Sequence, residues 1–595
     1  MLVRRWGVAL ALGSIACGKS TSVGPGNLVG SGGTMSASAG AGGPASVGGD
    51  ATAAAGTVVM PVAAGGAAAL AGAPSLAAGA AGLSQASAGA STGGQQVGLG
   101  ADPQPAADPV AVVGTSNSYL VFRQGIRDPD IKLMLLDLKG SGQPVQINAA
   151  NSKVITPKAS DNGRFLIHEQ VDALESPSHG FLPTPTAEDL QLLTFTDAGY
   201  IPAAAVAGFS GLTAMRLPGG FDASSRFVAF SRLDPRQPSG LDIVDAANRR
   251  RHASLSGPRV LGSVNWAPKG YFFTYRAKTN LSDNPNNDFL LAKLTADGVS
   301  EPQALPAYAN QATFTADGQR LFYSIDNGTI PFALGYIDPP AAPRQIYSGT
   351  GPNGFIGFWI EAAGQSVLTT LPDPNGGGLW VVARIFVDQA RPPQFLTEPS
   401  YSSSITMSES GSLAVLSILG DTTTRLEFLR GTERIKIAEG ASISGTFTGE
   451  HLVYYPDTSE SKPFWEVRSA TLVGSTVVDR RLAPADRNIS SFCQRVVPNP
   501  GTKFNYVYDQ PVPGIRFSDL EVDGPSATRT IDATNPAATV DCPVCNTAGN
   551  VCAFVERTDT SSKIFIVRFG PTGPSEPTLA FQSDQSLALY LAHLQ

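Results

Sequence analysis

The sequence predicts an all-β protein built from about ten repeated units of four short antiparallel strands, preceded by a disordered linker. The first observation is a repeat: an apolar strand, a tight turn and a second apolar strand recur along most of the chain. The second is composition, since the 595 residues include 64 Gly and 45 Pro but only 15% charged residues. Such a composition favours strands and turns over helices. Four-stranded antiparallel units in series are the blades of a β-propeller.

One unit shows the pattern clearly. Residues 311–324 read as a short strand, a turn at Ala316-Asp317-Gly318-Gln319 and an apolar strand that starts at Leu321. An Asp-Gly pair between apolar runs indicates a hairpin, because Gly adopts positive φ without a Cβ clash. A third strand is expected over residues 332–337 and a fourth over residues 344–347. Together these make one blade.

The same hairpin recurs eight more times. Its predicted turns, in addition to Asp317 and Gly318, are at Gly163, Ser225, Gly270, Gly364, Gly411, Gly449, Gly501 and Gly549. The mean spacing is near 48 residues, and a partial unit over residues 118–138 brings the number to ten. The spacing does not decide between one large ring and two smaller rings. The tail over residues 585–591 is expected to pair with the first unit and so close a ring, which removes an exposed edge.

These turns resemble the hairpin of TolB-like and WD40-like β-propellers. Ala316–Gln319 and Trp266–Gly270 are the copies most similar to that hairpin, and the resemblance extends over residues 110–582. It implies a propeller fold with variable loops between blades. No unit carries the Gly-His and Trp-Asp pairs of WD40 repeats themselves.

The amino terminus predicts export. Residues 1–16 combine Arg4 and Arg5 with a short apolar stretch and small residues, as in a secretory signal peptide. The segment also resembles a bacterial lipoprotein signal, in which the cysteine after the cleavage site is lipidated, and this assigns lipidation to Cys17. Ordinary cleavage after Ala16 is the alternative. Gly18, in place of Asp, favours an outer-membrane lipoprotein that is periplasmic or surface-exposed.

Residues 17–109 form the predicted linker. Between residues 18 and 100, 54 of 83 residues are Gly, Ala or Ser, and none is aromatic. A segment of this kind buries too little apolar area to offset its conformational entropy. We therefore expect a flexible tether, followed by a propeller over residues 110–595.

Four cysteines follow Cys17, and an even number in an exported protein favours disulfides. Cys545 and Cys552 flank a predicted hairpin turn, whereas Cys493 and Cys542 lie near the starts of neighbouring units. A four-cysteine zinc site is an alternative. A thioredoxin-like role for Cys542-Pro-Val-Cys545 is disfavoured, because no helix follows to lower a thiol pKa.

The residues Asp283, Asn284, Asn286 and Asp288 place four oxygen ligands of the type that Ca²⁺ prefers in one loop. The loop lacks the glycine and the final acidic residue of a calcium-binding loop, so a plain hairpin loop is the competing interpretation. No other cofactor is expected. Residues 349–354 have the glycine spacing of a dinucleotide-binding motif, but that motif must open a helix and a strand is expected to follow here, so no dinucleotide site is predicted.

Composition and motifs narrow the function to a class. The net charge of −7 leaves no basic surface for nucleic acid, and no catalytic motif or catalytic domain is expected. The sequence predicts a membrane-tethered binding or scaffold module for an envelope protein, peptide or glycan that the residues do not identify. One alternative is a propeller enzyme acting on glycans, which requires acidic residues at the central channel. Another is a Ca²⁺-dependent ligand sensor.

Overall fold

The computed structural model describes residues 102–103 and 118–593, apart from residues 126–131, 140–142, 149–151, 173–188, 208–214, 234–239, 257–258, 279–287, 327–331, 350–356, 377, 409, 441–442, 457–465, 484–485, 487, 494–502, 521–526 and 547. The predicted signal peptide, Cys17 and the linker up to residue 101 lie outside the described residues. Those residues form strands and turns, and they contain no α-helix.

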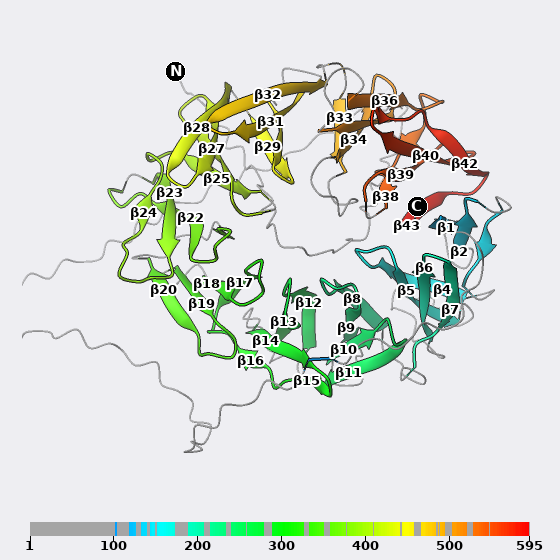
Figure 1. Cartoon of the computed structure of the whole chain (residues 1–595), viewed down its shortest axis with the longest axis horizontal. Coiled ribbons are helices and arrows are strands. Elements are labelled where there is room, and N and C mark those ends of the chain that lie inside the picture. Colours follow the sequence, from blue (N-terminus) through cyan, green and yellow to red (C-terminus); the bar gives the residue numbers. More distant parts are fainter. Residues whose placement is uncertain are drawn as a thin grey trace, which may run out of the picture. The chain divides into compact units, whose positions relative to one another are not determined.

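The strands form ten separate antiparallel sheets. Figure 1 shows these sheets as the blades of a single ring. The β-propeller prediction is therefore confirmed, and the open choice between one ring and two is settled in favour of one. In blades 2 to 10 the first strand in sequence is the innermost and the last is at the outer rim, whereas in blade 1 the innermost strand is the carboxyl-terminal strand of the chain.

From the innermost strand outward, blade 1 consists of β43 (Leu587–His593), β1 (Tyr119–Gln124), β2 (Lys132–Asp137) and β3 (Val145–Gln146), and blade 2 of β4 (Ser152–Ala159), β5 (Phe165–Asp172), β6 (Asp189–Thr196) and β7 (Gly199–Ala205). Blade 3 consists of β8 (Met215–Phe221), β9 (Phe227–Leu233), β10 (Gly240–Asp245) and β11 (Arg250–Ser256), and blade 4 of β12 (Arg259–Trp266), β13 (Phe272–Lys278) and β14 (Asp288–Thr295), with β15 (Gly298–Val299) and β16 (Gln303–Ala304) both paired to β14. Blade 5 consists of β17 (Ala309–Phe314), β18 (Leu321–Ile325), β19 (Ala333–Ile337) and β20 (Arg344–Ser348).

In the same order, blade 6 consists of β21 (Phe358–Ile360), β22 (Ser366–Pro372), β23 (Trp380–Phe386) and β24 (Gln394–Phe395), and blade 7 of β25 (Ser402–Met407), β26 (Ala414–Leu419), β27 (Thr424–Arg430) and β28 (Glu433–Gly440). Blade 8 consists of β29 (Ser444–Thr448), β30 (His451–Tyr455), β31 (Val467–Val473) and β32 (Thr476–Ala483), and blade 9 of β33 (Asn488–Phe492), β34 (Lys503–Gln510), β35 (Gly514–Asp519) and β36 (Thr528–Asp532). In blade 10, β37 (Thr539–Val540) and β38 (Val544–Cys545) both pair with β39 (Val551–Arg557), which pairs with β40 (Ser562–Gly570), and β41 (Gly573–Pro574) and β42 (Thr578–Ser583) both pair with β40.

The carboxyl-terminal strand closes the ring. β43 pairs antiparallel with β1, from Tyr119 opposite His593 to Gln124 opposite Leu587, and so becomes the innermost strand of blade 1. Leu587 is fully buried in a core cluster that includes Leu120 of blade 1 and Val551 of blade 10. The predicted pairing of the tail with the first unit is confirmed.

The apolar cores lie between neighbouring blades. Alternation of side chains along a strand sends successive residues to opposite faces of the sheet, so each blade packs on both sides. Ile167 and Leu192 of blade 2 share a cluster with Val228 and Phe230 of blade 3. In blade 2 itself, Leu166 and Leu193 pack instead on Val121 of blade 1. The stability of each blade therefore depends on its two neighbours.

Antiparallel connectivity gives the ring two distinct faces. The turns from first to second strand and from third to fourth strand lie on one face, which we call the turn face. The connections from second to third strand, and from each blade to the next, lie on the other, which we call the loop face. Residues 279–287 and 350–356 connect strand ends at the loop face. The strand ends that flank the two loops singled out in the sequence, 283–288 and 349–354, thus lie on one side of the ring.

Candidate functional site

The predicted blade turns join the innermost strand of a blade to its second strand. Positive φ occurs at Gly163, Ser225, Gly270, Gly318, Gly364, Gly411, Gly449 and Gly549. Gly501 lies outside the described residues. In the turn of blade 5, the Gly318 amide donates to the Thr315 carbonyl at 2.8 Å. The same three-residue bond recurs in blades 2, 3, 6, 7 and 10, so the repeat detected in the sequence is a repeat of backbone geometry.

A polar side chain caps most of these turns. In blade 3, Asp222 Oδ1 accepts the amides of Arg226 at 2.8 Å and Phe227 at 2.7 Å. Thr315 Oγ1 accepts the Arg320 amide at 3.1 Å in blade 5, and Ser408 Oγ accepts the Leu413 amide at 3.2 Å in blade 7. These bonds satisfy amides that the strand ladder leaves without a partner.

Adjacent turns pack on one another around the turn face. A Cβ added to Gly318 would overlap the backbone carbonyl of Lys269 in the preceding blade. The same addition at Gly364 would lie 2.8 Å from the Thr315 methyl group, and at Gly411 3.1 Å from the Ala362 amide. We call this chain of contacts the turn collar. Glycine is required there both for φ and for the close approach of the next blade.

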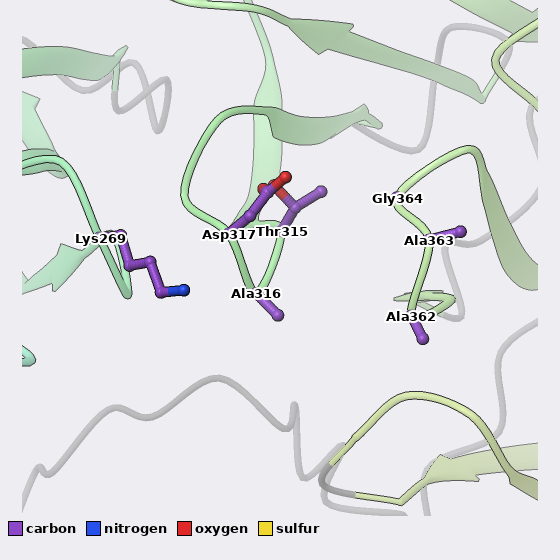
Figure 2. Close-up of a pocket in the computed structure, with 7 residues that line it drawn as sticks. All are labelled: Lys269, Thr315, Ala316, Asp317, Ala362, Ala363 and Gly364. Carbon is purple, nitrogen blue, oxygen red and sulfur yellow. The ribbon is translucent and has the colours of Figure 1, made fainter.

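A small cleft of about 250 Å³ opens where the collar passes from blade 4 to blade 6. Figure 2 shows the Lys269 side chain extending toward the blade 5 turn, with the Ala316 and Ala362 methyl groups beside the opening. The Asp317 carboxylate accepts hydrogen bonds from the Thr315 hydroxyl at 2.6 Å and the Gln319 amide at 3.0 Å. These bonds lower the pKa of Asp317. Because Asp317 is engaged within its own turn, the cleft offers one ammonium group and small apolar contacts.

The innermost strands carry hydroxyl and amide groups but no carboxylates. None of the strands β43, β4, β8, β12, β17, β21, β25, β29, β33, β37 and β38 contains Asp or Glu. Asp541, which lies between β37 and β38, forms an ion pair with Arg557. Asn265 and Gln311 reach the next blade and donate to the carbonyls of Ala312 at 3.1 Å and Phe358 at 3.3 Å. The paired carboxylates that glycan hydrolysis requires are thus not supplied by these strands.

Charge separates the two faces. The described connections of the loop face contain eight acidic residues and no Lys or Arg: Asp326, Asp373, Glu398, Asp421, Glu466, Asp486, Asp559 and Asp584. The turn face carries both signs, with Lys139, Lys269 and Arg391 among acidic residues. Clusters of one sign of charge, such as the acidic residues of these described connections, raise the local concentration of oppositely charged partners.

The basic run Arg249–His252 joins blades to one another. Arg249 begins this run at a third-to-fourth-strand turn and donates to the carbonyls of Leu192 at 2.6 Å and Pro202 at 3.0 Å in blade 2. His252 Nε2 lies 2.7 Å from the Thr295 carbonyl oxygen of blade 4. From its sequence alone this run looks like a solvated turn. Its partner carbonyls are about 50 residues away in sequence, so they become visible only in the folded ring.

The predicted disulfides are present, and the structure supplies the connectivity that the sequence leaves open. Cys545 and Cys552 face each other across β38 and β39, and their sulfurs are bonded. Cys493 is bonded to Cys542, which links the innermost strands of blades 9 and 10 across 49 residues. Closing a loop of that length stabilises the fold by about 4 kcal/mol in the chain-entropy picture. With all four sulfurs in disulfides, the zinc and thioredoxin-like interpretations are wrong.

The proposed calcium loop falls mostly outside the described residues. Asp283, Asn284 and Asn286 belong to the segment that the structure does not describe, and Asp288 is the first residue of β14. Within the described part of the chain, no group of three or more His, Cys, Asp or Glu side chains is arranged to hold a metal ion. The same part has no helix long and apolar enough to cross a membrane.

His168 is a buried titratable residue whose effect on stability the sequence does not reveal. It lies in β5, is fully buried, and neither ring nitrogen has a hydrogen-bond partner among the described residues. Burial lowers its pKa to about 4. The ring therefore stays neutral in the folded protein at pH values at which a histidine in the unfolded chain is charged.

Comparisons with known proteins return structures but no sequence relatives. Neither a protein-family model nor a curated protein matches the chain. A eukaryotic initiation factor is similar at 11% identity, covering 80% of this chain and 98% of the other, with a TM-score of 0.43. TolB from Acinetobacter baumannii matches at 11% identity over 54% of this chain and 83% of its own, with a TM-score of 0.23.

A prolyl endopeptidase is similar at 12% identity over 70% of this chain, with a TM-score of 0.35. The chain spans 55% of that peptidase. The propeller assignment rests on the strand topology described above.

Gly318 has both a positive φ and a neighbouring backbone that a Cβ would overlap, so alanine there should destabilise the fold more than alanine at a glycine that has positive φ alone. Gly376, in a loop-face connection, also has positive φ, but no atom lies within 4 Å of the position that a Cβ would take there. We expect Gly376→Ala to lower the free energy of unfolding by about 1 kcal/mol, the cost of left-handed φ alone. Gly318→Ala should cost about 2–4 kcal/mol, because the neighbouring backbone must also move. Denaturant unfolding of both variants measures this, and equal losses would contradict the collar.

His168 predicts a pH-dependent stability. Its folded pKa is depressed, so the stabilisation is complete above the unfolded value near 6.5 and is lost as pH falls toward 4. Between pH 7 and pH 5 the free energy of unfolding should fall by about 2 kcal/mol through this group. In His168→Leu that part of the fall should disappear. His451→Gln, at a partly exposed histidine, is the control and should keep it. An unchanged pH profile in His168→Leu would refute the assignment.

Proposed function

We propose that the protein is an extracytoplasmic binding module that presents its loop face to partners and uses the ring as a rigid scaffold. The observation that carries this proposal is the charge of that face, where eight carboxylates and no Lys or Arg occur in the described connections. Connections of this kind vary without disturbing the blades. The disulfides fit an oxidising compartment.

The proposal includes a lipid anchor. Residues 1–17 have the pattern of a lipoprotein signal, and the Gly-, Ala- and Ser-rich segment that follows has the composition of a long tether. Anchoring through Cys17 at the outer membrane is the arrangement that this pattern favours. A Cys17→Ala variant should then leave the membrane fraction in detergent partitioning. Unchanged partitioning would exclude the anchor and leave the binding proposal intact.

Binding is supported over catalysis by the innermost strands. A glycan hydrolase needs two carboxylates at defined separation beside its substrate. The strands nearest the channel offer none, whereas the loop face offers many that lie at the surface. Surface carboxylates attract and orient an oppositely charged partner through long-range charge.

Shortening loops on one face tests the proposal. Residues 279–287 and 350–356 connect strands at the loop face, and residues 521–526 connect β35 to β36 at the turn face. We expect shortening of the first two to leave the melting temperature nearly unchanged and to reduce crosslinked capture of envelope partners. The matched shortening of residues 521–526 should affect neither. Equal capture by all three proteins, or hydrolysis of a glycan panel, would contradict the proposal.

A further inference from the structure

Two exposed apolar residues have neighbouring backbones on the loop face. Among the described residues, Val145, Phe395, Val478 and Leu579 are exposed on outer strands, and Val473 is exposed at a turn-face strand end. Of the large apolar residues that are exposed in the described part of the chain, only Tyr401 (59% exposed) and Leu419 (39% exposed) lie on the loop face. The Tyr401 amide donates to the Leu419 carbonyl at 3.3 Å, so their backbones are adjacent.

Backbone hydrogen bonds extend this pair into a strip across blades 6 and 7. Ser400 exchanges two backbone hydrogen bonds with Trp380, at 2.8 and 2.9 Å, so the backbone of half-buried Trp380 pairs with the residue that precedes Tyr401. The Asp373 amide donates to the Leu379 carbonyl at 2.9 Å, so the Asp373 backbone lies beside the residue that precedes Trp380. At the other end, Asp421 follows Leu419 by two residues. We call Asp373, Trp380, Tyr401, Leu419 and Asp421 the acidic–aromatic strip.

The strip has a net negative charge. Asp373 accepts hydrogen bonds from the Asn375 amide at 3.0 Å and its side-chain nitrogen at 3.2 Å. Asp421 has no ion-pair partner within the described residues.

The nearby charges compensate one another. Glu398 lies 3.1 Å from Arg434 and 3.5 Å from Arg425. Glu427 lies 2.7 Å from the same Arg434. This quartet of two acids and two arginines is neutral as a group, so the uncompensated charge comes from Asp373 and Asp421.

We propose that the acidic–aromatic strip is a docking site for a basic, amphipathic polypeptide segment of a partner protein. Its apolar centre and charged ends match the anatomy of an interface, with an aromatic core and a polar rim. Charge selects the occupant. A second copy that docked through its own loop face would bring the same carboxylates, and an anionic lipid surface or a nucleic acid would also be repelled. Lys or Arg residues that flank apolar side chains satisfy both parts of the strip.

The proposal rests on the function proposed above, because it names the partner chemistry of the same loop face. The backbone bonds hold the strip in place before binding, so little conformational freedom is lost when a partner docks. Tyr401 is the expected anchor, since an exposed tyrosine offers a large rigid surface with few rotatable bonds.

Binding of a designed peptide to the full chain tests the proposal. The probe is a short fluorescent peptide that alternates Lys and Leu, and its counterpart replaces Lys with Glu. We expect the Lys/Leu peptide to bind with an affinity that falls as salt rises, and the Glu/Leu peptide not to bind. Tyr401→Ser with Leu419→Ser should weaken binding by about tenfold or more. Asp373→Asn with Asp421→Asn, which retains hydrogen-bonding capacity, should weaken binding and flatten its salt dependence.

The control variant is Val473→Ser with Asp388→Asn, which changes an exposed valine and an acid on the turn-face side. It should bind the Lys/Leu peptide as the parent protein does, and thermal unfolding should show all variants folded. Parent-like binding by both strip variants, or equal binding of the Glu/Leu peptide, would overturn the docking site. If loop shortening still abolished partner capture in that case, the binding module would stand and only this site would fall.

Discussion

The ends of the repeat array meet at the pairing of β43 with β1. A blade buries its apolar surface only against two neighbours, so an open array would leave one side of blade 1 and one side of blade 10 facing water. Here residues from the far carboxyl terminus supply the innermost strand of blade 1. Leu587 fills the core between the two terminal blades, and the His593 ring stacks on Phe195 of blade 2 at 5.2 Å between ring centres. Closure therefore supports three consecutive blades.

A closed ring allows the two faces to take different roles. On the turn face, short turns with positive φ fit against each other, and long side chains cross to neighbouring carbonyls. Arg320, for example, pairs with Asp338 and also donates to the Gly364 carbonyl of the next blade at 2.9 Å. The loop face is different, because its connections vary in length and, within the described residues, contain Asp and Glu but no Lys or Arg. Rigidity on one side holds surface groups such as those of blades 6 and 7 at fixed positions on the other.

Much of this architecture could be predicted from the sequence because it is locally encoded. The Asp317-Gly318 turn, its counterparts and the flanking apolar strands identify the blade repeat without any long-range information. The pairing of Cys545 with Cys552 also follows from a local hairpin. The number of rings could not be predicted, because the spacing of the turns along the sequence does not determine the angle between neighbouring blades.

The parts that prediction missed depend on distant residues. Nothing near Arg249 in sequence indicates the carbonyls of Leu192 and Pro202 that it meets. The charge difference between the described connections of the two faces becomes visible only when strand direction assigns each connection to a face. The adjacency of Trp380, Tyr401 and Leu419 likewise requires the pairing of blades 6 and 7.

Removal of the closing strand tests the central claim most directly. A chain that ends after residue 585 lacks β43, whereas a chain that ends after His593 keeps it and serves as the control. The closed ring predicts that the shorter chain loses cooperative thermal unfolding, or unfolds at a much lower temperature, while the control behaves as the full chain does. A shorter chain that unfolds at the temperature of the full chain would show that the blades do not depend on closure.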